Sequence, residues 1–304
     1  MKPIPVAFHI GPLEIHTYGI GLALTFWFAY GYFSRRLRDR GYSTDWVGAM
    51  FIWVIVAAVV GARALHVLSN LSFYDANPGD VFAIWHGGLS SFGGILLAVP
   101  TGIWQTHRRC PDLRVVEALD LVAPVLMAAW AMGRLLGPQL MVAGGGHPTH
   151  QWFGMYYAGQ AGKRLPVPIF QALEDFSIFC VLIAFERRLR RWPDGTPRRG
   201  FPAGGVIGVG MVLWGIERFL DEHLWLGEDG HLGSLLVQVA GIALAVGGVA
   251  LLMITRRRWT AWIRAGAPGG RAGDEDPDEG EPVSDDSGDS GGLDEPSAEG
   301  VGAP

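Results

Sequence analysis

Apolar residues gather along this chain in seven long runs separated by short polar segments. The runs cover residues 17–33, 46–68, 87–104, 115–136, 167–185, 203–224 and 235–254. A helix needs roughly 17–25 mostly apolar residues to cross the hydrocarbon core of a membrane. Only helices and closed barrels satisfy the backbone in lipid, and these runs are too long and too uniformly apolar for barrel strands. The pattern therefore predicts an all-α, polytopic integral membrane protein with seven transmembrane helices.

The composition agrees with this class and excludes several others. Of the 304 residues, 49% are hydrophobic and 17% are charged, against roughly 25% charged in an ordinary soluble domain. A disordered chain and a typical soluble enzyme are excluded. The two cysteines, Cys110 and Cys180, cannot form a disulfide framework. The sequence has no phosphate-binding loop, His-Glu-x-x-His, Gly-x-Ser-x-Gly or Cys-x-x-Cys motif, so no cofactor and no metal site are predicted.

The positive charges predict an orientation. Arginines cluster after the first, third, fifth and seventh runs, and these clusters hold 18 of the 24 basic residues. The opposite loops carry almost none, and an excess of Lys and Arg marks cytoplasmic loops. We therefore expect the N-terminus outside and the C-terminus in the cytoplasm. The basic loops lack interleaved aromatic residues, so they predict no nucleic-acid partner.

The last forty residues differ from the rest. Every Lys and Arg lies before residue 272, whereas residues 273–304 carry 12 Asp and Glu. Residues 266–304 are rich in Gly, Pro, Ser and acids, a composition typical of disorder. The chain thus divides into a membrane domain, 1–265, and a disordered acidic cytoplasmic tail, 266–304.

Charged side chains at the outer ends of two runs are the strongest candidates for function. A charge at membrane depth costs at least about 2.5 kcal/mol, so it usually marks a cavity, a partner or a function. Arg134 ends the fourth run, either as a side chain that reaches the interface or as a clamp for a phosphate group. Arg218 and Glu222 are four residues apart and can pair on one helix face, with Glu217 and Asp221 on the next ridge. Purely structural pairing remains an open alternative.

Two further segments combine small residues with a titratable group. Gly61 and Ala62 precede Arg63, and small residues allow helices to approach closely. His86 precedes a glycine pair, and a second pair follows at Gly93. His86 is a candidate base, although both Arg63 and His86 also fit plain interfacial residues.

Six segments of the chain resemble, in order, motifs of the bacterial prolipoprotein diacylglyceryl transferase family. They are Ile10-Gly11-Pro12 through His16-Thr17-Tyr18-Gly19, Gly61-Ala62-Arg63, Trp85-His86-Gly87-Gly88-Leu89-Ser90 with Gly93-Gly94, Gly133-Arg134-Leu135, Trp214-Gly215-x-x-Arg218 with Glu222, and Gln238. Each motif is weak alone, but the ordered set spans about 250 residues and is fairly specific.

The resemblance implies an enzyme of the bacterial plasma (inner) membrane. It would transfer the diacylglyceryl group of phosphatidylglycerol to the cysteine thiol of a preprolipoprotein lipobox and release glycerol phosphate. The implied partners are phosphatidylglycerol, the lipobox peptide and the lipid bilayer. By the same resemblance, Arg218 and Glu222 are expected to be catalytic, and His86 is added to them as the candidate base. The expected substrate-binding residues are Arg134, Tyr18, Arg63 and Gln238.

The chain departs from the family's motifs at positions that handle protons. Phe92 stands where the family has His, Val167 begins a motif that opens with His, and Trp214 replaces a Tyr. Phe accepts no proton and Trp offers no phenolic hydroxyl. Three hypotheses follow: a transferase with a relocated base, at His86 or His147; a phospholipid-binding paralogue without transfer; or a lipid transferase with a different acceptor or donor.

Overall fold

The structure of the protein is a computed structural model. The structure describes residues 6–10, 13–82, 90–137, 144–157, 160–190, 203–226 and 232–264. The predicted acidic tail, 266–304, and His86 lie outside these residues.

Each of the seven predicted runs corresponds to one long helix, so the helical prediction is confirmed. The helices are α1 Thr17–Arg38, α2 Val47–Ser69, α4 Ser91–Arg109, α5 Val115–Leu136, α7 Val167–Leu189, α8 Gly205–Asp221 and α9 Leu232–Arg264. Within the described ranges, four helical segments are long and apolar enough to cross a membrane: Val47–Ser69, Val115–Leu136, Val167–Leu189 and Ser234–Ala261. The protein is therefore a helical membrane protein.

Several elements differ from the predicted pattern. A two-stranded antiparallel hairpin, β1 Val6–Ile10 and β2 Leu13–His16, precedes α1. The short helix α3 Leu71–Ala76 and the 3-10 helix η1 Pro78–Phe82 follow α2. Helix α9 continues past the predicted end at residue 254 to Arg264. Arginine is a good helix former, so the end of an apolar run does not end the helix.

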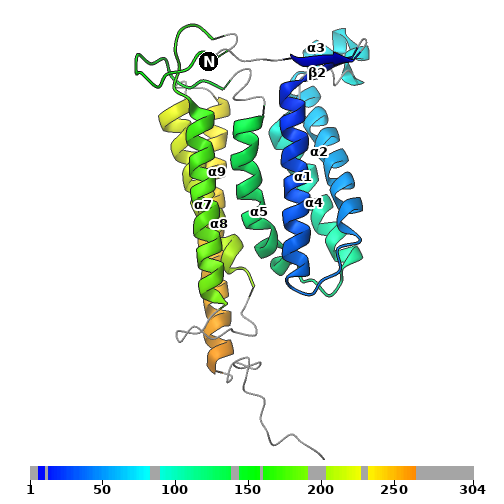
Figure 1. The fold of residues 1–304 in the computed structure, drawn as a ribbon, viewed down its shortest axis with the longest axis vertical. Helices are drawn as coiled ribbons and strands as arrows, with labels where there is room; N and C mark the ends of the chain where they lie inside the picture. Colours follow the sequence, from blue (N-terminus) through cyan, green and yellow to red (C-terminus); the bar gives the residue numbers. More distant parts are fainter. Residues whose placement is uncertain are drawn as a thin grey trace, which may run out of the picture.

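Helix α5 lies in the middle of the molecule (Figure 1), with α1 packed on one side and α7 on the other. Helices α2 and α4 pair beyond α1, and α8 and α9 pair beyond α7. Both pairs meet at glycines. A Cβ on Gly61 would lie 2.2 Å from the Gly93 carbonyl oxygen, and one on Gly215 would lie 2.5 Å from that of Gly241. The close helix approach predicted at Gly61 is confirmed.

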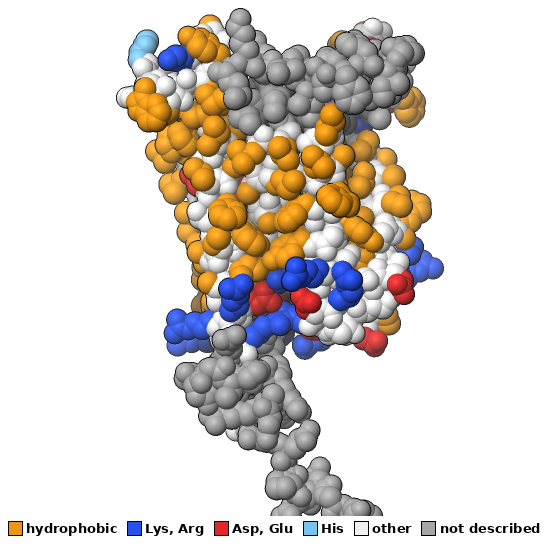
Figure 2. Space-filling model, in the orientation of Figure 1, with side chains coloured by type: hydrophobic (Ala, Val, Ile, Leu, Met, Phe, Trp, Pro, Cys, Tyr) orange, Lys and Arg blue, Asp and Glu red, His pale blue; other side chains and the backbone are white. Residues whose placement is uncertain are grey.

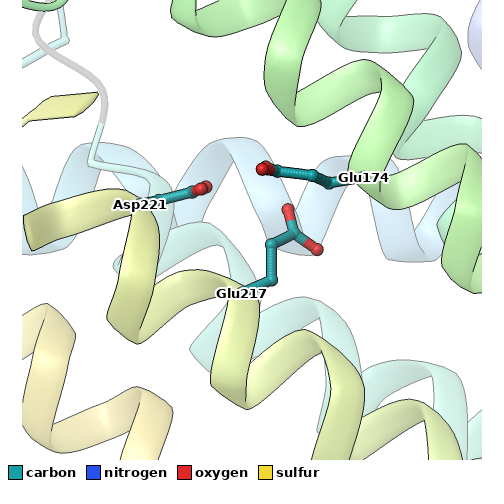
Figure 3. A group of neighbouring side chains, drawn as sticks. All are labelled: Glu174, Glu217 and Asp221. Carbon is teal, nitrogen blue, oxygen red and sulfur yellow. The ribbon is translucent and has the colours of Figure 1, made fainter. Parts of the chain in front are cut away.

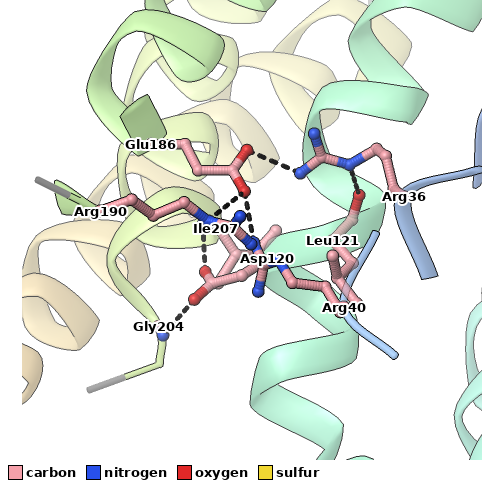
Figure 4. A network of polar contacts seen from close by, with 8 residues as sticks. All are labelled: Arg36, Arg40, Asp120, Leu121, Glu186, Arg190, Gly204 and Ile207. Carbon is pink, nitrogen blue, oxygen red and sulfur yellow. Dashed lines mark hydrogen bonds and ion pairs between the residues drawn. The ribbon is translucent and has the colours of Figure 1, made fainter. Parts of the chain in front are cut away.

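A buried polar network joins α1, α5 and α7 at the lower end of Figure 1, where basic side chains border the apolar surface in Figure 2. The Arg36 guanidinium donates to the Glu186 carboxylate at 2.8 Å and to the Leu121 carbonyl oxygen at 2.9 Å. Arg40 donates to the other Glu186 oxygen, and Arg190 lies 3.4 Å from the same oxygen (Figure 4). One carboxylate therefore holds three arginines, one in α1 and two just beyond the ends of α1 and α7.

In the same region, Asp120 of α5 caps the first turn of α8. Its carboxylate oxygens accept hydrogen bonds from the backbone N–H groups of Gly204 (2.7 Å) and Ile207 (2.8 Å). These N–H groups have no partner within the helix, and an anion is favoured beside them. Gly204 adopts φ 110°, which favours glycine. Asp120 thus fixes where α8 begins and how it faces α5.

Candidate functional site

The site is built around Arg134, at the end of α5 opposite the basic network. Its Nε lies 3.9 Å from Oδ2 of Asp175 on α7. The Arg134 side chain is 11% exposed and that of Asp175 is fully buried. Because a buried charge needs a partner, this carboxylate holds the guanidinium at the end of the helix bundle.

Arg218 of α8 supplies a second cation. Its guanidinium lies 3.3 Å from Oδ2 of Asp221 and 3.8 Å from Oε2 of Glu222. The predicted pairing with Glu222 is confirmed, but the closer carboxylate belongs to Asp221. The same Asp221 oxygen accepts a hydrogen bond of 2.7 Å from the Gln171 amide of α7. Asp221 therefore ties α7 to α8.

Acidic side chains connect the two arginines. One carboxylate oxygen each from Glu174, Glu217 and Asp221 lies within 4.8 Å of the others (Figure 3). Glu174 is the neighbour of Asp175 on α7, and Arg134 interacts electrostatically with Arg218, Glu217 and Asp221. Helices α5, α7 and α8 thus bring both arginines and their carboxylates into one charged cluster.

A polar pocket of about 530 Å³ opens beside this cluster. It is lined by Glu222 and, from the segment between α5 and α7, by His147, Arg164 and Gln160. The wall needs glycine at position 146, because a Cβ there would lie 2.1 Å from the Trp225 carbonyl oxygen. The pocket therefore joins an imidazole and a guanidinium to the carboxylate that pairs with Arg218.

The buried phenol of Tyr157 stands behind the pocket wall. A Cβ on Gly145 would lie 2.6 Å from its ring. Its hydroxyl has no hydrogen-bond partner among the described residues. Desolvation by burial raises the pKa of Tyr157 above its ordinary value, so the phenol stays protonated at neutral pH.

An apolar groove of about 710 Å³ runs along α5. It lies between α1, α5 and α7, and its lining includes Tyr32, Met132, Leu135, Leu173 and Phe176. Leu135 follows Arg134 in the chain, and Leu173 precedes Glu174. The groove therefore has the size and character for alkyl chains beside a charged head.

The sequence matches the model of the prolipoprotein diacylglyceryl transferase family over residues 5–254. The chain belongs to this family. It is 30% identical over 274 residues to the phosphatidylglycerol–prolipoprotein diacylglyceryl transferase of Pseudomonas paraeruginosa, covering 86% of this chain and 97% of that protein. It is 31% identical over 280 residues to the enzyme of that name from Pseudomonas fluorescens, covering 86% and 95%. For the one from Nitratidesulfovibrio vulgaris, the identity is 32% over 240 residues, with 76% and 84% covered.

The fold of this transferase family member brings together only part of the predicted site. Arg134, Arg218 and Glu222 share the charged cluster. The Gln238 amide of α9 lies 3.3 Å from Nδ1 of His223, the residue after Glu222. Gln238 thus borders the cluster without a described contact to either arginine.

The other predicted site residues stand apart or lie outside the described part. The Arg63 guanidinium donates to the Val81 and Asp80 carbonyl oxygens and stacks 5.3 Å from the centre of the Tyr74 ring. These contacts fasten the segment after α2. Tyr18 lies in the first turn of α1, but its side chain is not among those described, and His86 is outside altogether.

Sequence reasoning gave no role to Asp175, although it partners Arg134. The signal in the sequence is an acidic residue inside an apolar run, beside Glu174 and two residues before Ser177. The same rule that singled out Arg134 applies to it, since a charge in a membrane span needs a partner.

Proposed function

We propose that this protein transfers the diacylglyceryl group of phosphatidylglycerol to the cysteine thiol of a prolipoprotein lipobox. The observation that carries the proposal is the convergence of Arg134 and Arg218 in one charged cluster, whose helices α5 and α7 also line an apolar groove. Two guanidiniums suit a phosphodiester head, and the groove suits its acyl chains. Family membership supports the same reaction.

In this reaction the thiolate sulfur attacks the carbon of the diacylglyceryl group that is bonded to the phosphate oxygen. The carbon–oxygen bond breaks, and glycerol phosphate leaves with the bonding electrons. Negative charge grows on the leaving oxygen, where Arg134 and Arg218 would stabilise it. Asp175 and Glu222 would hold the two guanidiniums in position.

We propose that His147, rather than His86, is the base that accepts the proton of the thiol. His147 is exposed and lines the polar pocket together with Glu222 and Arg164. An imidazole in that pocket would have access both to the cluster and to an incoming peptide. His147 would thus replace the family's His, since Phe92 stands at that position and cannot accept a proton.

The finer topology is part of the proposal. All seven long helices would cross the plasma membrane, with the N-terminus outside and the acidic tail, residues 266–304, in the cytoplasm as a disordered segment. The band of basic side chains in Figure 2 supports this orientation. It puts the charged cluster on the extracytoplasmic side, where a secreted prolipoprotein emerges.

The test uses purified protein in nanodiscs that contain phosphatidylglycerol, with a fluorescent lipobox peptide. We expect a mass gain of one diacylglyceryl group on the cysteine. Arg218→Gln should lower the rate by roughly 100-fold or more, as loss of an oxyanion donor does. Arg114→Gln, a change to an exposed arginine at the opposite end, should leave it unchanged.

Two outcomes would redirect the proposal. The lipid-binding paralogue would be favoured if the protein binds phosphatidylglycerol without transfer and does not rescue a strain depleted of its own transferase. Transfer that survives His147→Ala would exclude His147 as the base.

A further inference from the structure

Among the residues that the structure describes, the charged cluster holds more carboxyl groups than guanidiniums. Two guanidiniums, of Arg134 and Arg218, face five carboxylates. The carboxylates are those of Glu174, Asp175, Glu217, Asp221 and Glu222. Like charges this close repel strongly in a site shielded from water, so the cluster calls for a further cation.

The Glu217 side chain marks the candidate position of that cation. The residue is 7% exposed, and neither of its carboxylate oxygens has a hydrogen-bond partner among the described residues. In Figure 3 its side chain points from α8 into the gap between Glu174 and Asp221. A buried carboxylate without a donor is costly unless it meets a cation or a proton.

The other two carboxylates offer free oxygens to the same gap. Oδ2 of Asp221 accepts from Gln171 and pairs with Arg218, whereas Oδ1 has no partner among the described residues. The same holds for Oε2 of Glu174. The arginines therefore leave one face of the cluster unneutralised.

The spacing of the three carboxylates suits one metal ion. Their nearest oxygens lie within 4.8 Å of one another. Ca²⁺ binds oxygen at roughly 2.3–2.6 Å, so ligands on opposite sides of one ion are about 4.6–5.2 Å apart. Hard carboxylate oxygens, with no thiol or imidazole in the group, are the ligands of Ca²⁺ and Mg²⁺.

We propose that Glu174, Glu217 and Asp221 bind one divalent cation of the calcium and magnesium class between α7 and α8. The ion offsets the excess negative charge beside Arg134 and Arg218. It also fastens α7 to α8 by a link additional to the Gln171–Asp221 hydrogen bond. Sequence motifs miss this site because its ligands come from two helices that are distant in the chain.

The ion's consequence for catalysis rests on the proposed function. A phosphodiester is an anion, and a cluster with surplus carboxylates repels it. A bound divalent cation reverses that local field and leaves both arginines available to the phosphate. Cation binding itself stands on the geometry of the cluster and can be measured without any transfer.

The test is equilibrium dialysis of chelator-stripped protein against radioactive Ca²⁺ in a neutral detergent, which excludes binding to anionic lipid. We expect one saturable ion per chain. Glu217→Gln and Glu174→Gln should each weaken its binding by at least about tenfold, since affinity follows the number of charged ligands. Asp75→Asn, a change to an exposed acid on α3 at the same end, should bind like wild type.

Thermal unfolding provides a second readout. Ca²⁺ should raise the unfolding midpoint of the wild type and of Asp75→Asn in a saturable way. Without Ca²⁺, Glu217→Gln should unfold no earlier than the stripped wild type, because it removes one of the repelling charges. This comparison shows that weak binding by the variant does not reflect misfolding.

The proposal is overturned if stripped wild type binds no Ca²⁺ or Mg²⁺ up to about 10 mM, beyond the range of weak extracellular sites. It is also overturned if both variants bind as tightly as wild type. Failure of the ion site and failure of the proposed function are distinguishable. Transfer at an unchanged rate by metal-free protein would refute only the ion's effect on catalysis. A bound ion in a protein without transfer would refute only the proposed reaction.

Discussion

The Arg134 guanidinium of α5 and the Asp175 carboxylate of α7 form an ion pair at 3.9 Å, with Asp175 fully buried. The two residues are 41 positions apart in the sequence. This pair links α5 to α7 within the charged cluster that also holds Arg218.

Arg134→Ala should weaken binding of phosphatidylglycerol by the purified protein by roughly 10- to 100-fold. The change removes a charge-assisted hydrogen bond worth about 1.5–3 kcal/mol. Lipid titration in neutral detergent measures the affinity, and Arg114→Ala serves as the matched control. Unchanged affinity in a folded Arg134→Ala protein would rule out the phosphate clamp.

Glu186→Gln should destabilise the protein by about 3–5 kcal/mol. The substitution removes the carboxylate that Arg36, Arg40 and Arg190 share and leaves buried guanidiniums uncompensated. Thermal unfolding in detergent should show a clearly lower midpoint. Glu117→Gln removes the ion pair with the exposed Arg114 and keeps an amide oxygen that can accept from the Tyr42 hydroxyl, so it should change stability by less than about 0.5 kcal/mol. Equal effects of the two changes would contradict a structural role for the network.

Gly61→Val should prevent α2 and α4 from packing, because its Cβ would overlap the Gly93 backbone. Gly31→Ala places its Cβ in open space on α1 and should be neutral or stabilising by up to about 1 kcal/mol. Yield of monodisperse protein and its unfolding midpoint measure both effects. Normal folding of Gly61→Val would mean that the two helices are not in contact at this position.

Cys110 should react slowly with a maleimide at pH 8, and the rate should keep rising at higher pH. Desolvation by burial raises the pKa of this thiol above its ordinary value, so the reactive thiolate forms only at more alkaline pH. The experiment uses Cys180→Ala, so that one thiol remains. If the reaction rate of the folded protein reached its plateau at the same pH as that of the unfolded protein, the raised pKa would be contradicted.

Reporter fusions after residues 40, 110, 195 and 265 should all give a cytoplasmic signal. Each position lies beside a cluster of arginines, and positive loops remain in the cytoplasm. A fusion after residue 150 should give an extracytoplasmic signal. An external signal at residue 195 would refute the seven-span topology, since six arginines lie within the surrounding segment.

The sequence by itself determined the seven helices, because apolar runs of membrane length leave the backbone few alternatives. It also determined local pairs such as Arg218 with Glu222, since the helical repeat places residues four apart on one face. The tight contact at Gly61 followed in the same way, from small residues that admit a neighbouring backbone.

Only the tertiary structure decided which distant charges meet. It paired Arg134 with Asp175 and gathered Glu174, Glu217 and Asp221 from two helices. It also brought the Arg63 guanidinium to the carbonyl oxygens of Asp80 and Val81, in the segment that follows α2. The physical reason is that the helical repeat fixes which face a side chain occupies, whereas its partner depends on which helix packs against that face and at what height.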